Sequence, residues 1–146
     1  MAVISNEQAS SKFSLHAISI EEACRHKWIE SEKQGRDLGH EAIRQWYCEH
    51  WLKYCRSKRI EHVIGCQAWQ EFEDGPSSLI LALLQSNDLL VQLIVDRLSQ
   101  GWENLDVIVW GITWGLPMER IQEILLELNI NCARFDPAIS LETRGD

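Results

Sequence analysis

The residues best suited to chemistry in this sequence are cysteines and histidines that lie close together along the chain. Cys24 precedes His26 with one residue between them, and the same spacing recurs at Cys48 and His50. On a helix, residues two positions apart point about 200° away from one another, so neither pair can share a metal ion. A structural zinc site uses four ligands. The sequence therefore predicts no metal and no cofactor.

The remaining candidate groups do not form a catalytic signature. Cys55 and His62 offer a nucleophile and a base, but a reactive thiol needs a lowered pKa that spacing alone does not create. The chain has no Gly-x-Ser-x-Gly turn and no glycine-rich phosphate loop. Glu22, His26 and Glu30 lie at steps of four, yet a carboxylate-bridged iron site also needs Glu-x-x-His pairs, which are missing. We expect a protein that is not an enzyme, with a tryptophan-lined ligand or active-site pocket as one alternative.

A binding surface has more support, within residues 40–64. Aromatic residues recur there at helical steps and end in a cluster of cations, and aromatic and arginine side chains carry much of the energy of protein contacts. The predicted partner-binding residues are Trp46, Tyr47, Trp51, Lys53, Arg56, Lys58 and Arg59. In the competing interpretation the aromatic residues belong to a core, and the cations are the solvated end of a helix, where positive charge suits the helix dipole.

The charge distribution favours a protein partner over nucleic acid. The net charge is −8; residues 1–73 hold ten Lys or Arg against eleven Asp or Glu, and residues 74–146 hold four against eleven. Phosphate binding needs a density of cations. A nucleic-acid-binding regulator nevertheless stays open as a second alternative.

Residues 115–125 resemble the first half of a helix-turn-helix. If residues 117–128 were the recognition helix, Glu119, Glu123 and Glu127 would face DNA phosphates. If they were the first helix, the next helix would begin near Asn131 with Arg134 as its only cation. Both placements disfavour DNA binding.

Length and composition indicate an ordinary globular protein. The 146 residues are 45% hydrophobic and 25% charged, which fits one domain with one core. The N-terminus lacks the pattern of a secretory signal, and no run approaches the roughly 18 apolar residues of a membrane helix. We therefore expect a cytoplasmic protein without a membrane span, whose five cysteines are reduced. The oligomeric state does not follow from the sequence.

The front half predicts a helical hairpin. Ser19 and Glu22 have the spacing of a capping box, so a first helix should run from Ile20 to about Gln34 and end at Gly35. Asp37 is placed to cap a second helix, whose wide aromatic stripe should anchor a core. Residues 60–64 fit a continuation of this helix or a short strand, and we favour helix.

The back half predicts further helices. Residues 66–73 keep a helical step, and residues 74–78 are a break. Helices are expected at 79–85, at 89–100 after a cap at Asn87 or Asp88, and at 117–128 with Pro117 in the first turn. Residues 103–114 fit a helix, with a strand still possible. The predicted fold is mainly α: a flexible arm at 1–18, a single domain of five or six helices at 19–130 that begins with the hairpin, and an irregular tail at 131–146.

One stretch of the hairpin resembles other proteins. The run from His26 to Lys33, HKWIESEK, is followed by GRDLG at 35–39 and by His50-Trp51. This pattern resembles a stretch in small uncharacterised bacterial proteins, and it covers roughly Cys24 to Gly65. The resemblance implies a recurring helical module and no particular activity.

Overall fold

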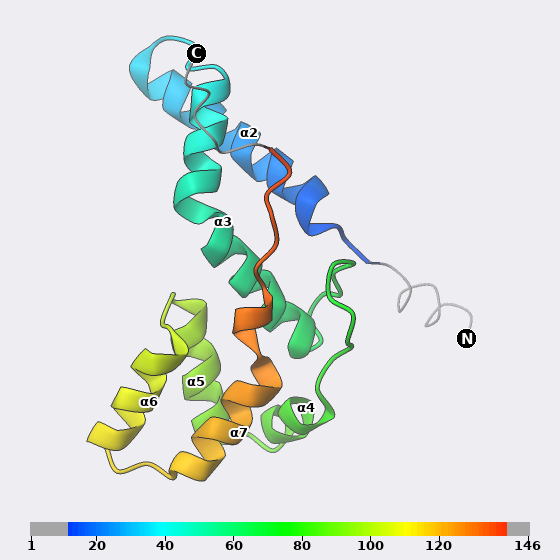
Figure 1. Cartoon of the computed structure of the whole chain (residues 1–146), viewed down its shortest axis with the longest axis vertical. Coiled ribbons are helices and arrows are strands. Elements are labelled where there is room, and N and C mark those ends of the chain that lie inside the picture. Colours follow the sequence, from blue (N-terminus) through cyan, green and yellow to red (C-terminus); the bar gives the residue numbers. More distant parts are fainter. Residues whose placement is uncertain (1–11, 140–146) are drawn as a thin grey trace, which may run out of the picture.

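A computed structural model describes residues 12–139 of the chain (Figure 1). The helices are, in chain order, α2 (Leu15–Gln34), α3 (His40–Val63), α4 (Ser78–Gln85), α5 (Leu89–Ser99), α6 (Asn104–Thr113) and α7 (Met118–Leu128), followed by the short 3-10 helix η1 (Ile130–Cys132). Within the described range there is no strand, only an isolated bridge between Phe13 and Trp69. The predicted mainly α, single-domain fold of five or six helices is confirmed.

Helices α2 and α3 form the predicted hairpin, the upper arm of the molecule in Figure 1. The link between them begins and ends with glycines in the left-handed region, Gly35 at φ 69° and Gly39 at φ 66°. Such angles suit glycine because it has no Cβ. The hairpin encloses a core rich in aromatic residues, in which Tyr47, Trp51 and Cys55 of α3 are buried.

A second core lies where α4, α5, α6 and α7 surround the end of α3, in the lower part of Figure 1. Ile60 and Val63 of α3 belong to this second cluster, and Ile94, Ile121 and Leu128 are completely buried in it. Because α3 contributes side chains to both clusters, it joins the two halves of the domain.

The chain after α7 returns along α3 toward the hairpin, drawn from orange to red in Figure 1. Ala133 is completely buried, and the indole Nε1 of Trp51 donates a hydrogen bond of 2.6 Å to the carbonyl oxygen of Phe135. The predicted irregular tail is therefore not loose: Ile130–Cys132 form a 3-10 turn, and residues 133–139 pack against the hairpin. Residues 140–146 of that tail lie outside the described part.

Helix α2 begins at Leu15, five residues earlier than predicted. Its cap is Ser14, whose hydroxyl accepts from the Ala17 amide, and not Ser19. Ser19 is buried, and its hydroxyl lies 2.8 Å from the Tyr47 hydroxyl. The predicted flexible arm is therefore wrong for residues 15–18, because the side chain of Leu15 is buried in the hairpin core. Residues 1–11 lie outside the described part.

A distant carboxylate completes this helix start. Glu71 accepts hydrogen bonds from the Leu15 amide at 2.8 Å and from the Ser14 hydroxyl at 2.9 Å. Partial burial alone would raise the pKa of Glu71, but these hydrogen bonds outweigh it and hold the pKa below its usual value. Glu71 thus stabilises the start of α2 only while it is ionised.

Glu71→Gln should lower the free energy of unfolding by about 1 kcal/mol at pH 7, the usual effect of losing a helix cap. A lowered folded-state pKa gives stability that is present above the unfolded pKa of about 4.3 and is lost as the pH falls through the folded value. The gap to wild type should therefore be full above the unfolded pKa and shrink progressively as the pH falls below it. Urea unfolding at several pH values measures it, with the exposed Glu32→Gln as the control. A gap independent of pH would show that the ionised carboxylate does not act as the cap.

Some of the other predicted helix boundaries and caps are confirmed, and others are wrong. Residues 60–63 continue α3 and residues 104–113 form α6, so helix is confirmed over strand in both places. Asp88 caps α5 as predicted, with its carboxylate on the Val91 amide. Asp37 does not cap α3; its carboxylate accepts from the Gly39 amide within the link. The helical step at 66–73 is misleading, because Ala68 and Gln70 bond to the backbone of Phe13 instead.

None of the described helices is by itself long and apolar enough to cross a membrane. Helices α4 and α5 together have the length and composition, but the chain bends by 114° between them.

Candidate functional site

The aromatic part of the predicted binding surface lies inside the protein. Trp46, Tyr47 and Trp51 are buried between α2, α3 and the returning segment. They pack against one another, with ring centroids of Trp46 and Tyr47 5.0 Å apart and of Tyr47 and Trp51 5.5 Å apart. The prediction that they present a docking surface is wrong, because a helix with so wide an apolar stripe is covered on more than one side. The competing interpretation, an aromatic core, is correct.

The cations of the same cluster point in different directions. Arg59 is buried: its guanidinium donates two hydrogen bonds to the Asp74 carboxylate and one to the Leu128 carbonyl. Arg56 pairs with Glu103, and Lys58 pairs with a neighbour on its own helix. Only Lys53 is exposed and makes no ion pair among residues 12–139.

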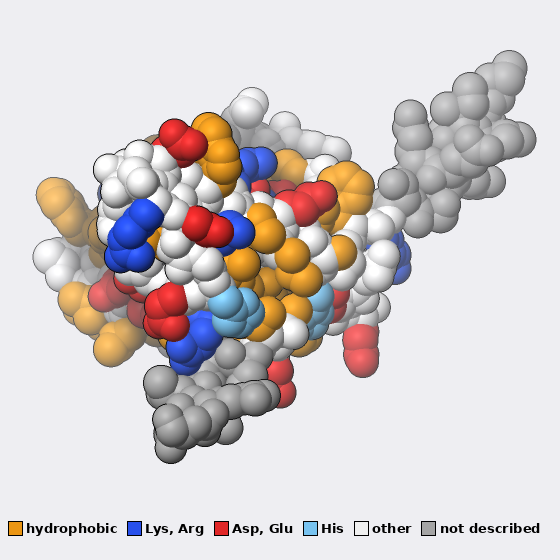
Figure 2. Space-filling model, turned by 90° about the horizontal axis from the view of Figure 1, so that it is seen from above, with side chains coloured by type: hydrophobic (Ala, Val, Ile, Leu, Met, Phe, Trp, Pro, Cys, Tyr) orange, Lys and Arg blue, Asp and Glu red, His pale blue; other side chains and the backbone are white. Residues whose placement is uncertain are grey.

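The surface does not gather positive charge at the hairpin end either. Figure 2 looks onto this end and shows basic, acidic and hydrophobic side chains interleaved, without a continuous basic area. The predicted positive tip, Lys53 to Arg59, lies toward the other end of α3, and it is not assembled there because Arg59 is buried and Arg56 and Lys58 are ion-paired.

Among the helices of residues 12–139, α6 has the most exposed apolar face. Leu105, Val109 and Ile112 lie at positions i, i+4 and i+7, so they share one face, and they are 68%, 52% and 66% exposed. We name these three residues the α6 strip. Trp114, directly after the helix, is exposed as well. Soluble proteins seldom leave such a continuous row uncovered unless it contacts something.

The opposite face of α6 is firmly packed. Val107 and Gly111 are buried there, and a Cβ on Gly111 would lie only 2.3 Å from Cδ1 of Ile121. Trp110 lies against the guanidinium of Arg97, 4.5 Å from the ring centroid. Because its inner face is fixed in this way, α6 presents the strip on a rigid support.

Exposed acidic residues lie at the start of α6 and on the neighbouring helix α7. Glu103 and Asp106 form a capping box at the start of α6, and both are exposed. Glu119 and Glu123 occupy exposed positions on α7, the helix that packs most closely on α6. These carboxylates belong to the half of the chain that carries most of the negative charge.

The sequence itself contains a signal for this strip, although residues 103–114 were expected only to form a helix, with a strand still possible. On a helix, however, Val107 and Gly111 form one apolar face, and the α6 strip forms a second. A helix on the outside of a small domain buries only one face, so the second face was a candidate for exposure.

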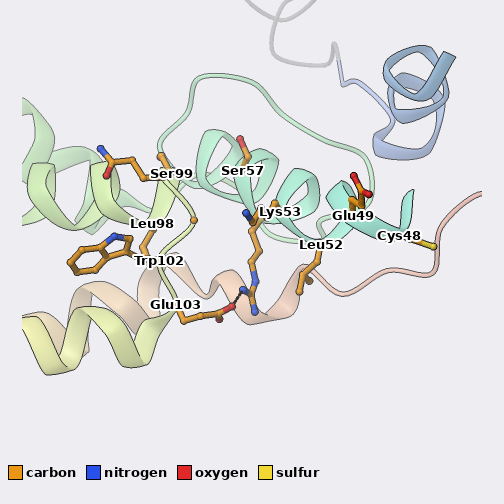
Figure 3. Close-up of a pocket in the computed structure, with 12 residues that line it drawn as sticks. Cys48, Glu49, Leu52, Lys53, Ser57, Leu98, Ser99, Trp102 and Glu103 are labelled. Carbon is orange, nitrogen blue, oxygen red and sulfur yellow. Dashed lines mark hydrogen bonds and ion pairs between the residues drawn. The ribbon is translucent and has the colours of Figure 1, made fainter. Parts of the chain in front are cut away.

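One cleft lies between the two halves of the domain, with a volume of about 320 Å³ (Figure 3). Its walls come from α3, from the end of α5 and from the connection between α5 and α6, with Leu52, Leu98 and Trp102 among the apolar residues. Two cations and two carboxylates line it: Lys53 and Arg56, Glu49 and Glu103. These charges balance, so the lining selects for no charged ligand.

The groups weighed for catalysis or metal binding are not arranged for either. Burial raises the pKa of the Cys55 thiol to about 12, so it stays protonated and is a poor nucleophile. Both imidazole nitrogens of His62 have protein partners, the Asp74 carbonyl and the Trp69 amide. In the part of the chain that the structure covers, no three His, Cys, Asp or Glu side chains converge as metal ligands would.

No protein-family model, curated protein or solved structure matches this chain. The resemblance of Cys24 to Gly65 to small bacterial proteins therefore stays a prediction. Any function has to be argued from the geometry.

Proposed function

We propose that this protein is a non-enzymatic interaction module that docks another protein on the α6 strip. The observation that carries the proposal is the row formed by Leu105, Val109 and Ile112, each more than half exposed on a helix whose other face is fixed in the core. The aromatic surface predicted on α3 cannot serve, because its tryptophans and Arg59 are buried.

The shape and charge of the strip favour a particular partner. A straight row of apolar side chains with helical spacing fits the apolar face of a second helix. The exposed carboxylates of Asp106 on α6 and of Glu119 and Glu123 on the neighbouring helix α7 favour Lys or Arg in a partner that covers α6. A second copy of this chain would instead bring like charges together. The partner we propose is an amphipathic helix with basic flanks.

The size of the strip argues for reversible binding. Helix α6 has 10 residues, and at about 1.5 Å per residue it is roughly 15 Å long. One helix face of that length offers a few hundred Å², below the roughly 800 Å² per partner of a standard stable interface. Such contacts suit a regulatory encounter that forms and dissociates readily.

The charge distribution of the structure does not favour nucleic-acid binding. The cations predicted to contact phosphates are buried, paired or separated, and exposed acidic side chains lie on α6 and on the neighbouring helix α7. A protein surface with these charges repels a phosphate backbone.

Affinity capture from the native host tests the proposal. The Leu105→Gln, Ile112→Gln double variant should capture about one tenth or less of the partner that wild type captures, because two central apolar contacts are lost. The melting temperature should hardly change, since exposed positions contribute little to stability. The matched control is the Ile20→Gln, Trp28→Gln double variant, which removes two exposed apolar residues from α2. If the control loses the partner and the α6 variant keeps it, the docking surface is on the hairpin.

A further inference from the structure

His16, near the start of α2, has a hydrogen-bond acceptor at each nitrogen of its imidazole ring. Nδ1 lies 3.2 Å from a carboxylate oxygen of Glu71, and Nε2 lies 2.8 Å from the carbonyl oxygen of Asp136. A neutral imidazole has one N–H group and one lone pair, so it can donate to only one of these two oxygens. The ring donates to both only when each nitrogen carries a proton, and it is then a cation.

His62 shows the other arrangement in the same protein. Its Nε2 faces the carbonyl oxygen of Asp74, whereas its Nδ1 accepts a hydrogen bond of 3.1 Å from the Trp69 amide. One acceptor and one donor around the ring match a neutral imidazole with its proton on Nε2. The surroundings of His62 therefore require one ring proton, and those of His16 require two.

The groups packed around His16 come from three parts of the chain. The loop after α3 contributes the Glu71 carboxylate, and the segment after η1 contributes Asp136. Helix α3 contributes the uncharged Trp51 ring, with its centroid 5.6 Å from that of the imidazole, and the Cys55 thiol near Glu71, which burial keeps protonated. A carboxylate and a carbonyl oxygen both favour the cationic form of the ring over the neutral form.

The bond from His16 to Asp136 helps to hold the returning segment, residues 133–139, against the hairpin. The same segment accepts the hydrogen bond of 2.6 Å from the indole Nε1 of Trp51 to the Phe135 carbonyl. These two bonds lie at neighbouring positions of the segment. The indole N–H of Trp51 therefore reports whether the segment is closed over the hairpin core.

We propose that His16 is a proton-dependent latch: its cationic form fastens the returning segment over the hairpin, and loss of one ring proton loosens that segment. A neutral ring turns a lone pair toward either Glu71 or the Asp136 carbonyl, so one of the two bonds is lost. The stability that the latch contributes is fully present below about pH 6.5, the pKa of a histidine in an unfolded chain, and is lost as the pH rises above it. The latch does not involve the α6 strip, so the two proposals stand or fall independently.

Nitrogen-15 nuclear magnetic resonance of the imidazole rings counts these protons directly in the full-length wild-type chain. At about pH 7, above the pKa of an ordinary histidine, His16 should have the chemical shifts of a doubly protonated ring. His62 should have those of a neutral ring protonated on Nε2. A neutral His16 ring at this pH would overturn the proposal.

Hydrogen exchange of the Trp51 indole N–H, expressed as a protection factor, measures the loosening. Protection should fall by about threefold to tenfold between about pH 5.5 and pH 8, less than for a fully enclosed charged hydrogen bond, because the His16 side chain is 37% exposed. His16→Gln should show the lower protection at both pH values, since glutamine does not titrate. The matched control is His40→Gln, an exposed histidine at the start of α3, which should keep the wild-type pH profile. Protection that does not depend on pH in the wild type, or that keeps its pH dependence in His16→Gln, would contradict the latch.

Discussion

Replacing Trp51 with alanine should lower the free energy of unfolding by about 3–5 kcal/mol, the usual cost of removing a large buried aromatic side chain. Trp51 is 7% exposed, stacks on Tyr54 with centroids 5.8 Å apart, and bonds through its indole to Phe135. The substitution therefore opens a cavity in the hairpin core and also releases the segment that returns from α7. Because small domains are stable by only about 5–15 kcal/mol, the variant should be close to unfolding at ordinary temperature.

Urea unfolding followed by circular dichroism measures this effect. The matched control is Trp28→Ala, which removes the same side chain from a position that is 64% exposed, and it should change stability by less than about 0.5 kcal/mol. Similar losses in the two variants would mean that Trp51 does not lie in a core, and the predicted aromatic surface on α3 would then have to be reconsidered.

Asp74→Ala should lower the free energy of unfolding by about 2–3 kcal/mol, because it leaves the buried Arg59 charge without its partner. The Arg59 side chain is only 2% exposed, whereas that of Asp74 is 58% exposed, so water can approach the pair from the Asp74 side. This opening keeps the expected loss below that of a completely enclosed pair. Arg59 also bonds to the Leu128 carbonyl, so the pair joins α3 to the end of α7 and to the loop before α4.

Arg59→Met should be milder than Asp74→Ala, at about 1–2 kcal/mol. Methionine keeps an apolar stem in the core and removes the buried charge instead of stranding it. The remaining carboxylate at position 74 is free to take up water. Urea unfolding of both variants gives the comparison. If Arg59→Met proved the more damaging of the two, the main contribution of Arg59 would be its packing and its bond to Leu128, and not the ion pair.

Helical periodicity was sufficient to predict the fold class and most helices. The helix ending at Gly35 and the cap at Asp88 depend on neighbouring residues, so a local pattern predicts them. The start of α2 does not depend on neighbours alone. It needs Glu71, more than 50 residues away, and Ser14 in place of Ser19. Residues 66–73 fail for the same reason, because their backbone pairs with Phe13.

The binding surface was mispredicted for a different physical reason. Tryptophan, tyrosine and arginine are enriched both in cores and at interfaces. The composition of α3 therefore could not decide whether Trp46 and Trp51 face the interior or a partner. The decision depends on what covers α3, and one cover is the segment at 133–139, which follows α3 by some 70 residues. The α6 strip, in contrast, is visible in the spacing of Leu105, Val109 and Ile112 once two apolar faces are counted.

Site-specific photo-crosslinking tests most directly whether α6 is the docking surface. A photoreactive phenylalanine derivative is placed at position 109 in the α6 strip and, in a second protein, at the exposed position 28 on α2. The account predicts a crosslink from position 109 to another protein, mapped by mass spectrometry to a helix with Lys or Arg beside its apolar face, and none from position 28. Crosslinks from position 28 but not from 109, or from 109 only to a second copy of this chain, would contradict it.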